Sequence, residues 1–395
     1  RAITVFGHVC YDFSSPKIQR TGPDNAVLGI AGLEREGLMT AVQLRERHGL
    51  EIKDVAEKQG WDLFELSGSK GGPAASAALS AFQLLTEGTV DFYGMIGNDR
   101  IGDLIAAYFD SYCIDGGNLI RSEHPTSYTL VINEDLDLGK ESRTFLHETG
   151  ANGFAAVSDY PETCFKFNKA ERNVVMVGGS FLMPGLHPNG TLDIFRKAKD
   201  QKAFTILSTV RDPSEKWELG KGASELIDLL IMDRHEACKI AGYDNNVTGS
   251  FLLNWFNGSH FRNVIITDGT NGAFMYATDP NIFAKADGFP FHVPASELIM
   301  SLDRPKYGLG CGDCAAGGFA VAVAEHMTPL QAGLFAMSAG GACALNIAGE
   351  IGEPVAQGEH RYLVNFLFNQ MLRQLGMVED RLTPAQVDSA RRILQ

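Results

Sequence analysis

The chain of 395 residues is short of positive charge and of long hydrophobic runs. Its 34 lysines and arginines stand against 48 aspartates and glutamates, which gives a formal net charge of −14. A surface of this sign repels the phosphates of DNA and RNA, so we expect no nucleic-acid partner. No uninterrupted stretch of about 18 apolar residues occurs, so we expect no membrane span. The most apolar tract, residues 333–349, is rich in Gly and Ala and is typical of a packed core helix.

Cysteine is sparse as well, and its distribution argues against a disulfide framework. Seven cysteines are scattered through the chain, which is typical of a reducing compartment, so we predict a cytoplasmic protein. Cys311 and Cys314 form a C-x-x-C spacing that leaves open a redox role or half of a zinc site. We disfavour both, because no second Cys pair exists and the surrounding glycines already have another use.

Two common nucleotide-binding motifs are absent. The chain has no Gly-x-x-x-x-Gly-Lys-Ser/Thr, which disfavours a P-loop kinase. No Gly-x-Gly-x-x-Gly follows the first apolar run, which disfavours a dinucleotide-binding oxidoreductase. NAD retained on purification would be the observation that revives the oxidoreductase.

What the chain does have is an alternation of short apolar runs and helical stretches, with enough hydrophobic content (45%) to bury a large core. This order predicts an α/β fold: a doubly wound, mostly parallel sheet with helices on both faces. Binding sites in such folds gather at the carboxyl ends of the strands. Asp12, Asp233, Thr267 and Asp313 follow such ends or begin the next helix, so we expect them to share one site. The predicted strands are residues 3–7, 90–93, 174–177, 204–207, 229–232 and 264–267.

A glycine-rich turn, residues 308–313, leads directly into the small-residue run 314–324, which is typical of a buried helix. Glycines and the free amides of a helix N-terminus favour a bound anion such as phosphate. Asp313 would be repelled by a resident phosphate, so its presence indicates a reacting hydroxyl nearby from which a proton is taken. The alternative is that Asp313 only caps the helix, since Asp is a favoured N-cap residue.

This turn resembles the second signature of the ribokinase, or PfkB, family of carbohydrate and nucleoside kinases, whose usual form is Asp-Thr-x-Gly-Ala-Gly-Asp. Gly310-Cys311-Gly312-Asp313 matches its second half, while Tyr307 and Gly308 replace the Asp-Thr pair. The resemblance implies that Asp313 is the general base and that the amides of Gly310, Cys311 and Gly312 help form an anion hole. Because the missing pair lies beside the family's monovalent-cation site, that cation is a doubtful cofactor.

Other motifs agree with the family in the same order. Residues 7–12 resemble the strand end that carries a substrate-binding Asp, and residues 71–78 resemble the first signature, where a Gly-Gly turn opens a helix against the bound sugar. Residues 150–152 are similar to the return from the lid to the core, with an Asn near the reacting groups. The substrate-binding residues implied by the resemblance are Asp12, Gly71, Gly72, Ser76 (in place of a frequent Asn) and Asn152.

The resemblance also implies ATP and Mg²⁺. Residues 229–236 are similar to an Asn-x-x-Glu motif, with Asp233 for Asn, so Glu236 and Asp233 would act on Mg²⁺ through water. The alternative is a solvated helix start, where acids are favoured by the helix dipole. Residues 264–273 indicate a strand, a turn and a second strand, and a helix is expected over 330–347. The nucleotide-binding residues implied there are Thr267, Gly269, Gly272 and Asn346.

Two segments stand outside the alternation, residues 14–70 and 124–147, and we predict that they form a lid. The kinase core is then 1–13, 71–123 and 148–395. Residues 127–132 have the period-two pattern of a strand, whereas 38–58 are mostly helical in pattern. The first segment elaborates the lid or forms a subunit interface, so a homodimer through the lid is open.

The expected function is ATP-dependent phosphorylation of a hydroxyl on a sugar or sugar-like compound. A purine nucleoside kinase stays open, because nucleoside kinases of the family also carry a long segment between the first Asp and the Gly-Gly turn. A base would need a wall from Tyr11, Phe13, Tyr128 or Phe154. A catalytically silent ligand-binding member also stays open, given the altered signature positions.

Overall fold

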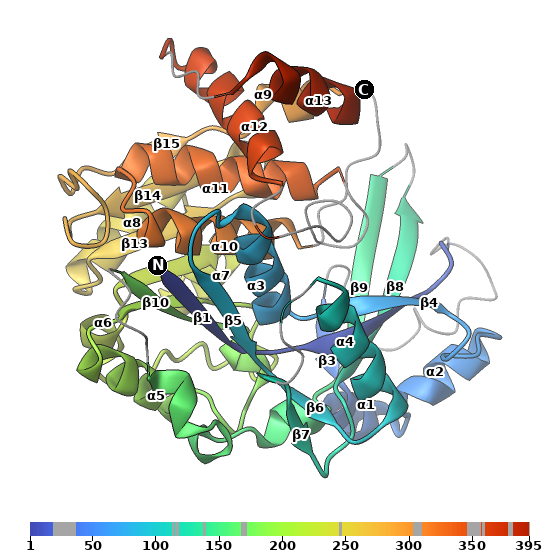
Figure 1. Cartoon of the computed structure of the whole chain (residues 1–395). Helices are drawn as coiled ribbons and strands as arrows, with labels where there is room; N and C mark the ends of the chain where they lie inside the picture. The colour runs from blue at the N-terminus through green and yellow to red at the C-terminus, as the bar shows by residue number, and fades with distance from the viewer. Residues whose placement is uncertain are drawn as a thin grey trace.

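A computed structural model describes residues 1–18, 37–112, 114, 118–136, 140–166, 172–244, 247–302, 310–345, 357, 360–377 and 382–394. Its main sheet has eight strands in the order β15-β14-β13-β12-β11-β10-β1-β5 (Figure 1). All neighbours from β5 to β13 pair in parallel, and β14 and β15 are antiparallel. The strands are β1 (Ala2–Gly7), β5 (Thr89–Tyr93), β10 (Asn173–Gly178), β11 (Phe204–Ser208), β12 (Leu229–Asp233), β13 (Asn263–Thr267), β14 (Ala273–Ala277) and β15 (Phe291–Val293). The six predicted strands and the fold class are confirmed.

The main sheet is covered on both faces, which explains why its strands are apolar at nearly every position. Successive residues of a strand point to opposite faces. Accordingly, Val174 and Met176 of β10 belong to one hydrophobic cluster, and Val175 and Val177 belong to the other. Helices α3 (Pro73–Leu84), α4 (Arg100–Ser111), α10 (Cys311–Ala324), α11 (Pro329–Cys343) and α12 (Arg361–Gln374) cover the first face. Helices α5 (Asn189–Asp200), α7 (Arg234–Ile240) and α8 (Gly249–Gly258) cover the second.

Small residues let α3, α10 and α11 pack unusually close together. A Cβ atom added at Gly317 of α10 would lie 2.4 Å from the carbonyl oxygen of Ala77 on α3. One added at Gly318 would lie 2.9 Å from the Cα of Ala336 on α11. The run 314–324 is therefore a helix buried on all sides, as its composition predicted. This contact holds the N-terminus of α10 against the main sheet.

A second sheet of five strands, in the order β3-β9-β8-β2-β4, lies beside the main sheet (Figure 1). Its elements are β2 (Cys10–Ser14), β3 (Leu38–Thr40), β4 (Ser67–Gly71), β8 (Tyr128–Leu136), β9 (Lys140–Glu148) and the helices α1 (Ala41–His48) and α2 (Ile52–Lys58). It has its own apolar cluster, which includes Phe13, Leu44 and Leu130. The strand predicted for 127–132 is confirmed as part of β8.

The second sheet differs from the expected lid in where it begins. It takes in residues 10–14, most of which we had assigned to the core, because β2 pairs with β4 and β8 and not with the main sheet. Residues 38–58 are mostly helical, as their pattern predicted: α1 and α2 follow β3, and Gly49 in a left-handed conformation ends α1.

Short elements complete the described part of the chain: β6 (Met95–Gly97), β7 (Ile120–Ser122), α6 (Ala223–Leu226), α9 (Glu297–Ser301), α13 (Pro384–Leu394) and the 3₁₀ turns η2 (Gly150–Phe154), η3 (Val157–Asp159), η4 (Glu162–Phe165), η5 (Ser180–Leu182) and η6 (Gly269–Asn271). No helix among the described residues has the length and apolarity needed to cross a lipid bilayer. The six cysteines in the described ranges form no disulfide with one another. Cys311 and Cys314 of the C-x-x-C spacing are among these six.

We predict that Phe256→Ala destabilises the protein far more than Phe251→Ala, although both lie on α8. Phe256 is fully buried and Phe251 is 46% exposed. The buried change should cost about 3–5 kcal/mol through lost burial and the cavity left behind, and the exposed one about 1 kcal/mol or less. Urea unfolding followed by circular dichroism measures both. Equal shifts in the two midpoints would contradict the packing of α8 on β13 and β14.

Candidate active site

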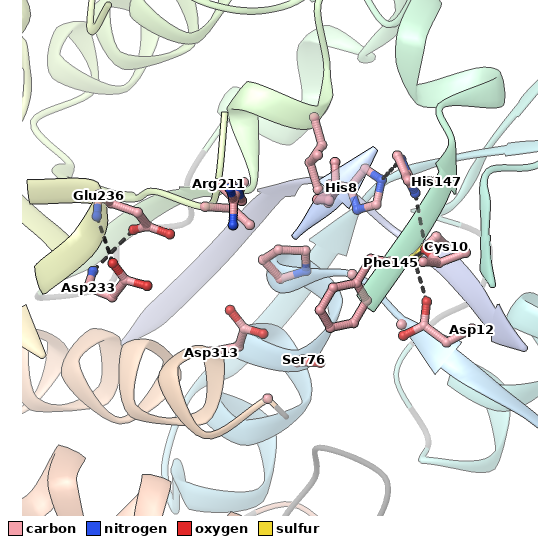
Figure 2. A pocket seen from close by; sticks show the side chains of 18 of the residues that line it. His8, Cys10, Asp12, Ser76, Phe145, His147, Arg211, Asp233, Glu236 and Asp313 are labelled. Carbon is pink, nitrogen blue, oxygen red and sulfur yellow. Dashed lines mark hydrogen bonds between the residues drawn. The ribbon is translucent and has the colours of Figure 1, made fainter. Parts of the chain in front are cut away.

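A cavity of about 1330 Å³ lies between the carboxyl end of the main sheet and the second sheet. Its walls come from β2, β4, β8 and β9 on one side, and from the ends of β12 and β13 and the start of α10 on the other. Figure 2 shows Asp313 between Asp12 on one side and Asp233 with Glu236 on the other. The location agrees with the rule for open parallel sheets.

Most of the predicted site residues meet in this cavity. Those that line it are Asp12, Gly71, Gly72, Ser76, Asp233, Glu236, Thr267, Gly269, Gly310 and Asp313. Cys311, Gly312, Asn152 and Gly272 are described but do not line it. Asn346 lies outside the described residues, as do Gly308 and Leu309 of the glycine-rich turn.

The start of α10 presents a carboxylate beside backbone amides. Gly310 is the N-cap, with a left-handed φ of 79° that favours glycine, and Asp313 is in the first turn. The alternative in which Asp313 caps the helix is therefore wrong. The first amides of a helix have no intrahelical acceptor, and a Cβ added at Gly312 would meet nothing within 4 Å. The turn thus leaves space in which an anion can approach these amides.

The surroundings of the Asp313 carboxyl raise its pKa. Burial raises its pKa to about 6; the positive charge of Lys70 opposes this shift, and the charge of Asp12 adds to it. A carboxyl group with this pKa is ionised at neutral pH, and its carboxylate is a better proton acceptor than that of an exposed aspartate.

Asp12 and the Gly-Gly turn are in contact. A Cβ added at Gly71 would lie 2.2 Å from the Oδ2 atom of Asp12, so only glycine fits beside this carboxylate. Gly72 has a φ of 101°, and a Cβ there would lie 2.5 Å from the carbonyl oxygen of His8. Asp12 was expected just past the first core strand, but it lies inside β2 of the second sheet.

Lys70 is a site residue that sequence reasoning missed. It lies on β4, is only 2% exposed, lines the cavity and donates a hydrogen bond from Nζ to Ser76 Oγ at 2.7 Å. Because Lys70 reaches Ser76, a side chain shorter than the family's frequent Asn can make a polar contact at position 76. The only signal in the sequence is its position directly before Gly71-Gly72, which does not reveal burial.

Asn152 has a different location from the one expected. It is buried in η2, where its Nδ2 donates to the carbonyl oxygen of Val9 at 2.7 Å and to Ser127 Oγ. Its Oδ1 has no partner within the described ranges. Asn152 therefore ties the β1–β2 connection to the start of β8, and it does not contact the cavity.

A cluster of His8, Cys10 and His147 was also missed. The Nε2 atoms of the two histidines lie 3.2 Å apart, and the Nδ1 of His147 lies 3.1 Å from Thr129 Oγ1. The Cys10 thiol donates to Asp12 Oδ1 at 3.2 Å. Burial lowers the pKa of both histidines, that of His147 to about 4, so both rings are neutral at pH 7. The two histidines are 139 positions apart in the chain, and no sequence pattern links them.

Asp233 and Glu236 form a capping box at the start of α7. Asp233 Oδ1 accepts from the amide of Glu236 at 2.7 Å, and Glu236 Oε2 accepts from the amide of Asp233 at 3.1 Å and from Thr209 Oγ1 at 2.6 Å. Burial, and then the charge of Asp233, raise the pKa of Glu236 to about 8, and burial also raises that of Asp233. The solvated helix start is wrong for Glu236, which is buried. A buried carboxylate beside one that reaches solvent fits a divalent cation, which would favour their ionised forms.

The remaining predicted residues lie at the end of β13. Thr267 and Gly269 line the cavity, and the hydroxyl of Thr267 donates to the carbonyl oxygen of Met232 at 3.4 Å. Gly272 supports the turn from behind, since a Cβ there would lie 2.1 Å from the carbonyl oxygen of Val293. Arg211 and Arg234 bring positive charge to this end of the cavity, and neither was predicted.

None of the four aromatic residues considered for a base-binding wall lines the cavity. Tyr11, Phe13 and Tyr128 pack in the second sheet's apolar cluster, and Phe154 stacks on His124. Phe145 of β9 is an aromatic residue that does line the cavity (Figure 2).

Comparison with known proteins gives one family and one fold. The model of the pfkB family of carbohydrate kinases matches residues 55–354. No curated protein matches the chain. Similar solved structures are ribokinase from Thermotoga maritima (TM-score 0.63, 17% identity, covering 92% of this chain and 99% of that one) and adenosine kinase from Sinorhizobium meliloti (0.66, 14%, 90% and 97%). A probable sugar kinase from Rhizobium etli CFN 42 is also similar (0.65, 15%, 95% and 98%). At these identities the structures show a shared fold.

We predict that Glu236→Gln raises the melting temperature increasingly as pH rises from about 4.5 to about 8. The pKa of Glu236 is about 8 in the folded protein, against an ordinary value of 4.5. Between these pH values the unfolded chain has lost this proton while the folded protein keeps it, so the stability of the wild type falls as pH rises. Below pH 4.5 variant and wild type should melt alike. Above pH 8 their difference should be constant and amount to several degrees.

The measurement is thermal unfolding with EDTA present, so that no divalent cation offsets the charge. Glu46→Gln, an exposed glutamate on α1, is the matched control and should show no such trend. A difference between Glu236→Gln and wild type that does not vary with pH would contradict the assignment.

Proposed function

The chain belongs to the pfkB family of carbohydrate kinases, and we propose that it transfers the terminal phosphoryl group of ATP to a hydroxyl of a sugar or sugar-like acceptor. The observation that carries this proposal is the position of Asp313. Its carboxylate stands in the first turn of α10, beside amides that suit an anion, and it lines the same cavity as Asp12 and Glu236. A base next to an anion site is what phosphoryl transfer to an alcohol requires.

In this proposal Asp313 accepts the proton of the acceptor hydroxyl. The pKa of about 6 supports the role, because the group is ionised at neutral pH yet basic enough to take a proton. Lys70 is a positioning residue that keeps Asp313 ionised despite its burial. The oxygen of the hydroxyl then attacks the phosphoryl group, and ADP leaves.

The amides of Gly310, Cys311, Gly312 and Asp313 would stabilise charge on the transferring phosphoryl group. Their orientation is fixed by α10, so they need no reorganisation during the reaction. Loss of one such donor typically lowers the rate by about a hundredfold or more. Packing of α10 between α3 and α11 supports this rigidity.

The acceptor would lie between Asp313 and the second sheet. Asp12 would accept hydrogen bonds from the hydroxyls of the acceptor. Lys70 and Ser76 would contact the acceptor next to the Gly71-Gly72 turn. With the second sheet over the acceptor, water that would otherwise take the phosphoryl group is excluded.

Asp233 and Glu236 would hold Mg²⁺ through water, since Mg²⁺ keeps several of its waters and needs few protein oxygens. Bound there, the cation supplies charge neutralisation to the phosphates. Arg211 and Arg234 would add to this positive field, and Thr267 and Gly269 would border the nucleotide. Asn346 is proposed for the adenine pocket on the resemblance alone.

A purine nucleoside is the second candidate acceptor. Phe145 favours it, because this residue offers a flat apolar surface at the acceptor end, against which a base could stack. The adenosine kinase from Sinorhizobium meliloti has the same fold. A panel of ketoses, aldoses, sugar acids and nucleosides separates the two candidates by turnover.

We predict that Asp313→Asn lowers turnover by about 10²–10⁴-fold, because the hydroxyl proton loses its acceptor. ADP release from magnesium-ATP measures this with each compound of the panel. Asp103→Asn, on the exposed face of α4, is the control and should retain full activity. Turnover that persists in Asp313→Asn would exclude this base. If wild type turns over no compound while some raise its melting temperature, a silent ligand-binding protein becomes the better reading.

We predict that kcat/KM rises with pH, with the midpoint of the rise near pH 6, and that Lys70→Met moves this rise to higher pH. The lysine charge opposes the upward pKa shift of Asp313, so its removal makes the carboxyl ionise later. Lys199→Met, which removes a lysine paired with Asp228 far from the cavity, should leave the profile unchanged. If the rise of kcat/KM with pH occurs at the same pH in Lys70→Met as in wild type, Lys70 does not act on the ionisation of Asp313.

A further inference from the structure

His8, Cys10 and His147 lie together at the acceptor end of the cavity, on the side opposite Asp233 and Glu236 (Figure 2). Each is at most 3% exposed, and their potential ligand atoms all lie within 4.8 Å of one another. We propose that these three residues bind a divalent transition metal ion, with Zn²⁺ as the preferred ion. The carbohydrate-kinase reaction does not call for such a site, so the proposal stands on this geometry alone.

The spacing of the two imidazoles is close to that of ligands on one zinc ion. Zn–N bonds of about 2.0–2.1 Å at a tetrahedral angle put two nitrogens about 3.3 Å apart. The Nε2 atoms of His8 and His147 are 3.2 Å apart. For a nitrogen and a thiolate sulfur the same geometry gives about 3.6 Å, which the 4.8 Å limit accommodates. Small side-chain movements would therefore complete the site.

The hydrogen bond to Thr129 prepares His147 as a ligand. With Nδ1–H of His147 donating to Thr129 Oγ1 at 3.1 Å, the Nε2 lone pair points at the cluster. A ligating histidine is usually oriented by such a bond from its other ring nitrogen. His8 must then donate its Nε2 proton to His147, which leaves His8 Nδ1 buried without a partner in the described part of the chain. A metal ion bound by both Nε2 atoms would replace the hydrogen bond between them, and the His8 proton would move to Nδ1.

Cys10 decides which metal the site prefers. Its thiol proton, now donated to Asp12 Oδ1, would be released to solvent when the sulfur coordinates the ion. A thiolate with two imidazoles suits zinc and disfavours Mg²⁺, which prefers oxygen ligands. Three protein ligands leave a fourth position, and since all three residues line the cavity it would hold water or an acceptor oxygen.

Cobalt(II) is the probe, since it takes zinc sites and its thiolate bond gives a charge-transfer band in the near ultraviolet. We expect one equivalent of Co²⁺ to produce this band in full-length, metal-stripped protein, and Zn²⁺ to abolish it, whereas excess Mg²⁺ should not. Cys10→Ser should lose the band. Thr129→Val should weaken binding about 10–100-fold through loss of the bond that orients His147. Absence of a band in wild type would overturn the proposal.

The controls separate this site from the other cysteines. Two control variants should keep the band: Cys164→Ser, at a buried cysteine in the apolar cluster on the second face of the main sheet, and Cys343→Ser, at the cysteine beside Cys311. A band lost in Cys343→Ser and kept in Cys10→Ser would place the metal elsewhere and refute the proposal. X-ray absorption of the zinc-loaded wild type needs no variant and should show one sulfur and two imidazoles; an all-oxygen shell would refute it as well. No measurement here depends on phosphoryl transfer, so failure of the kinase proposal would not decide this one.

Discussion

The close contact of α10 with α3 and α11 is the constraint on which the rest of the site depends. At Gly317 and Gly318 even one extra carbon atom would collide with a neighbouring backbone, so the axis and register of α10 have little freedom. Its first turn is thereby held at the carboxyl edge of the main sheet, where β12 and β13 end. Asp313 and the amides beside it have a fixed place relative to Asp233 and Glu236 because three helices leave no room for anything larger.

The cavity also brings many charged side chains together. Five of the described carboxylates line it, those of Asp12, Asp233, Glu236, Asp268 and Asp313. Burial raises the pKa of Asp233, Glu236 and Asp313. Lys70 offsets this at the acceptor end, and Arg211 and Arg234 do so at the other. Since charges interact more strongly where water is displaced, a cation or a phosphate entering here changes the protonation of its neighbours. Ligand binding and proton uptake are therefore coupled in this cavity.

Patterns that are local in the chain predicted the fold well. The six parallel strands could be predicted because each is a short apolar run, and the helix over 314–324 because its glycines and alanines suit tight packing. Asp313, Glu236 and Gly71 could be found from motifs a few residues long. Lys70, and the pair of His8 with His147, depend on burial and on strand pairing across the second sheet, which no local pattern encodes. The same reason explains the errors: Asn152 turned inward to Val9, and Asp12 lies in β2 because its strand pairs with β4 and β8.

Only His8 and Val9 separate β1 in the main sheet from β2 in the second sheet. On the proposed assignment, the residues that choose the acceptor lie mostly in the second sheet, while those that handle the phosphate lie at the ends of β12 and β13 and on α7 and α10. Substitutions that reshape the second sheet can thus alter the acceptor without disturbing the helices that hold the phosphate. Because of this division, the second sheet can accept substitutions that change the specificity for the acceptor, while the packing of the helices that hold the phosphate restricts substitution there.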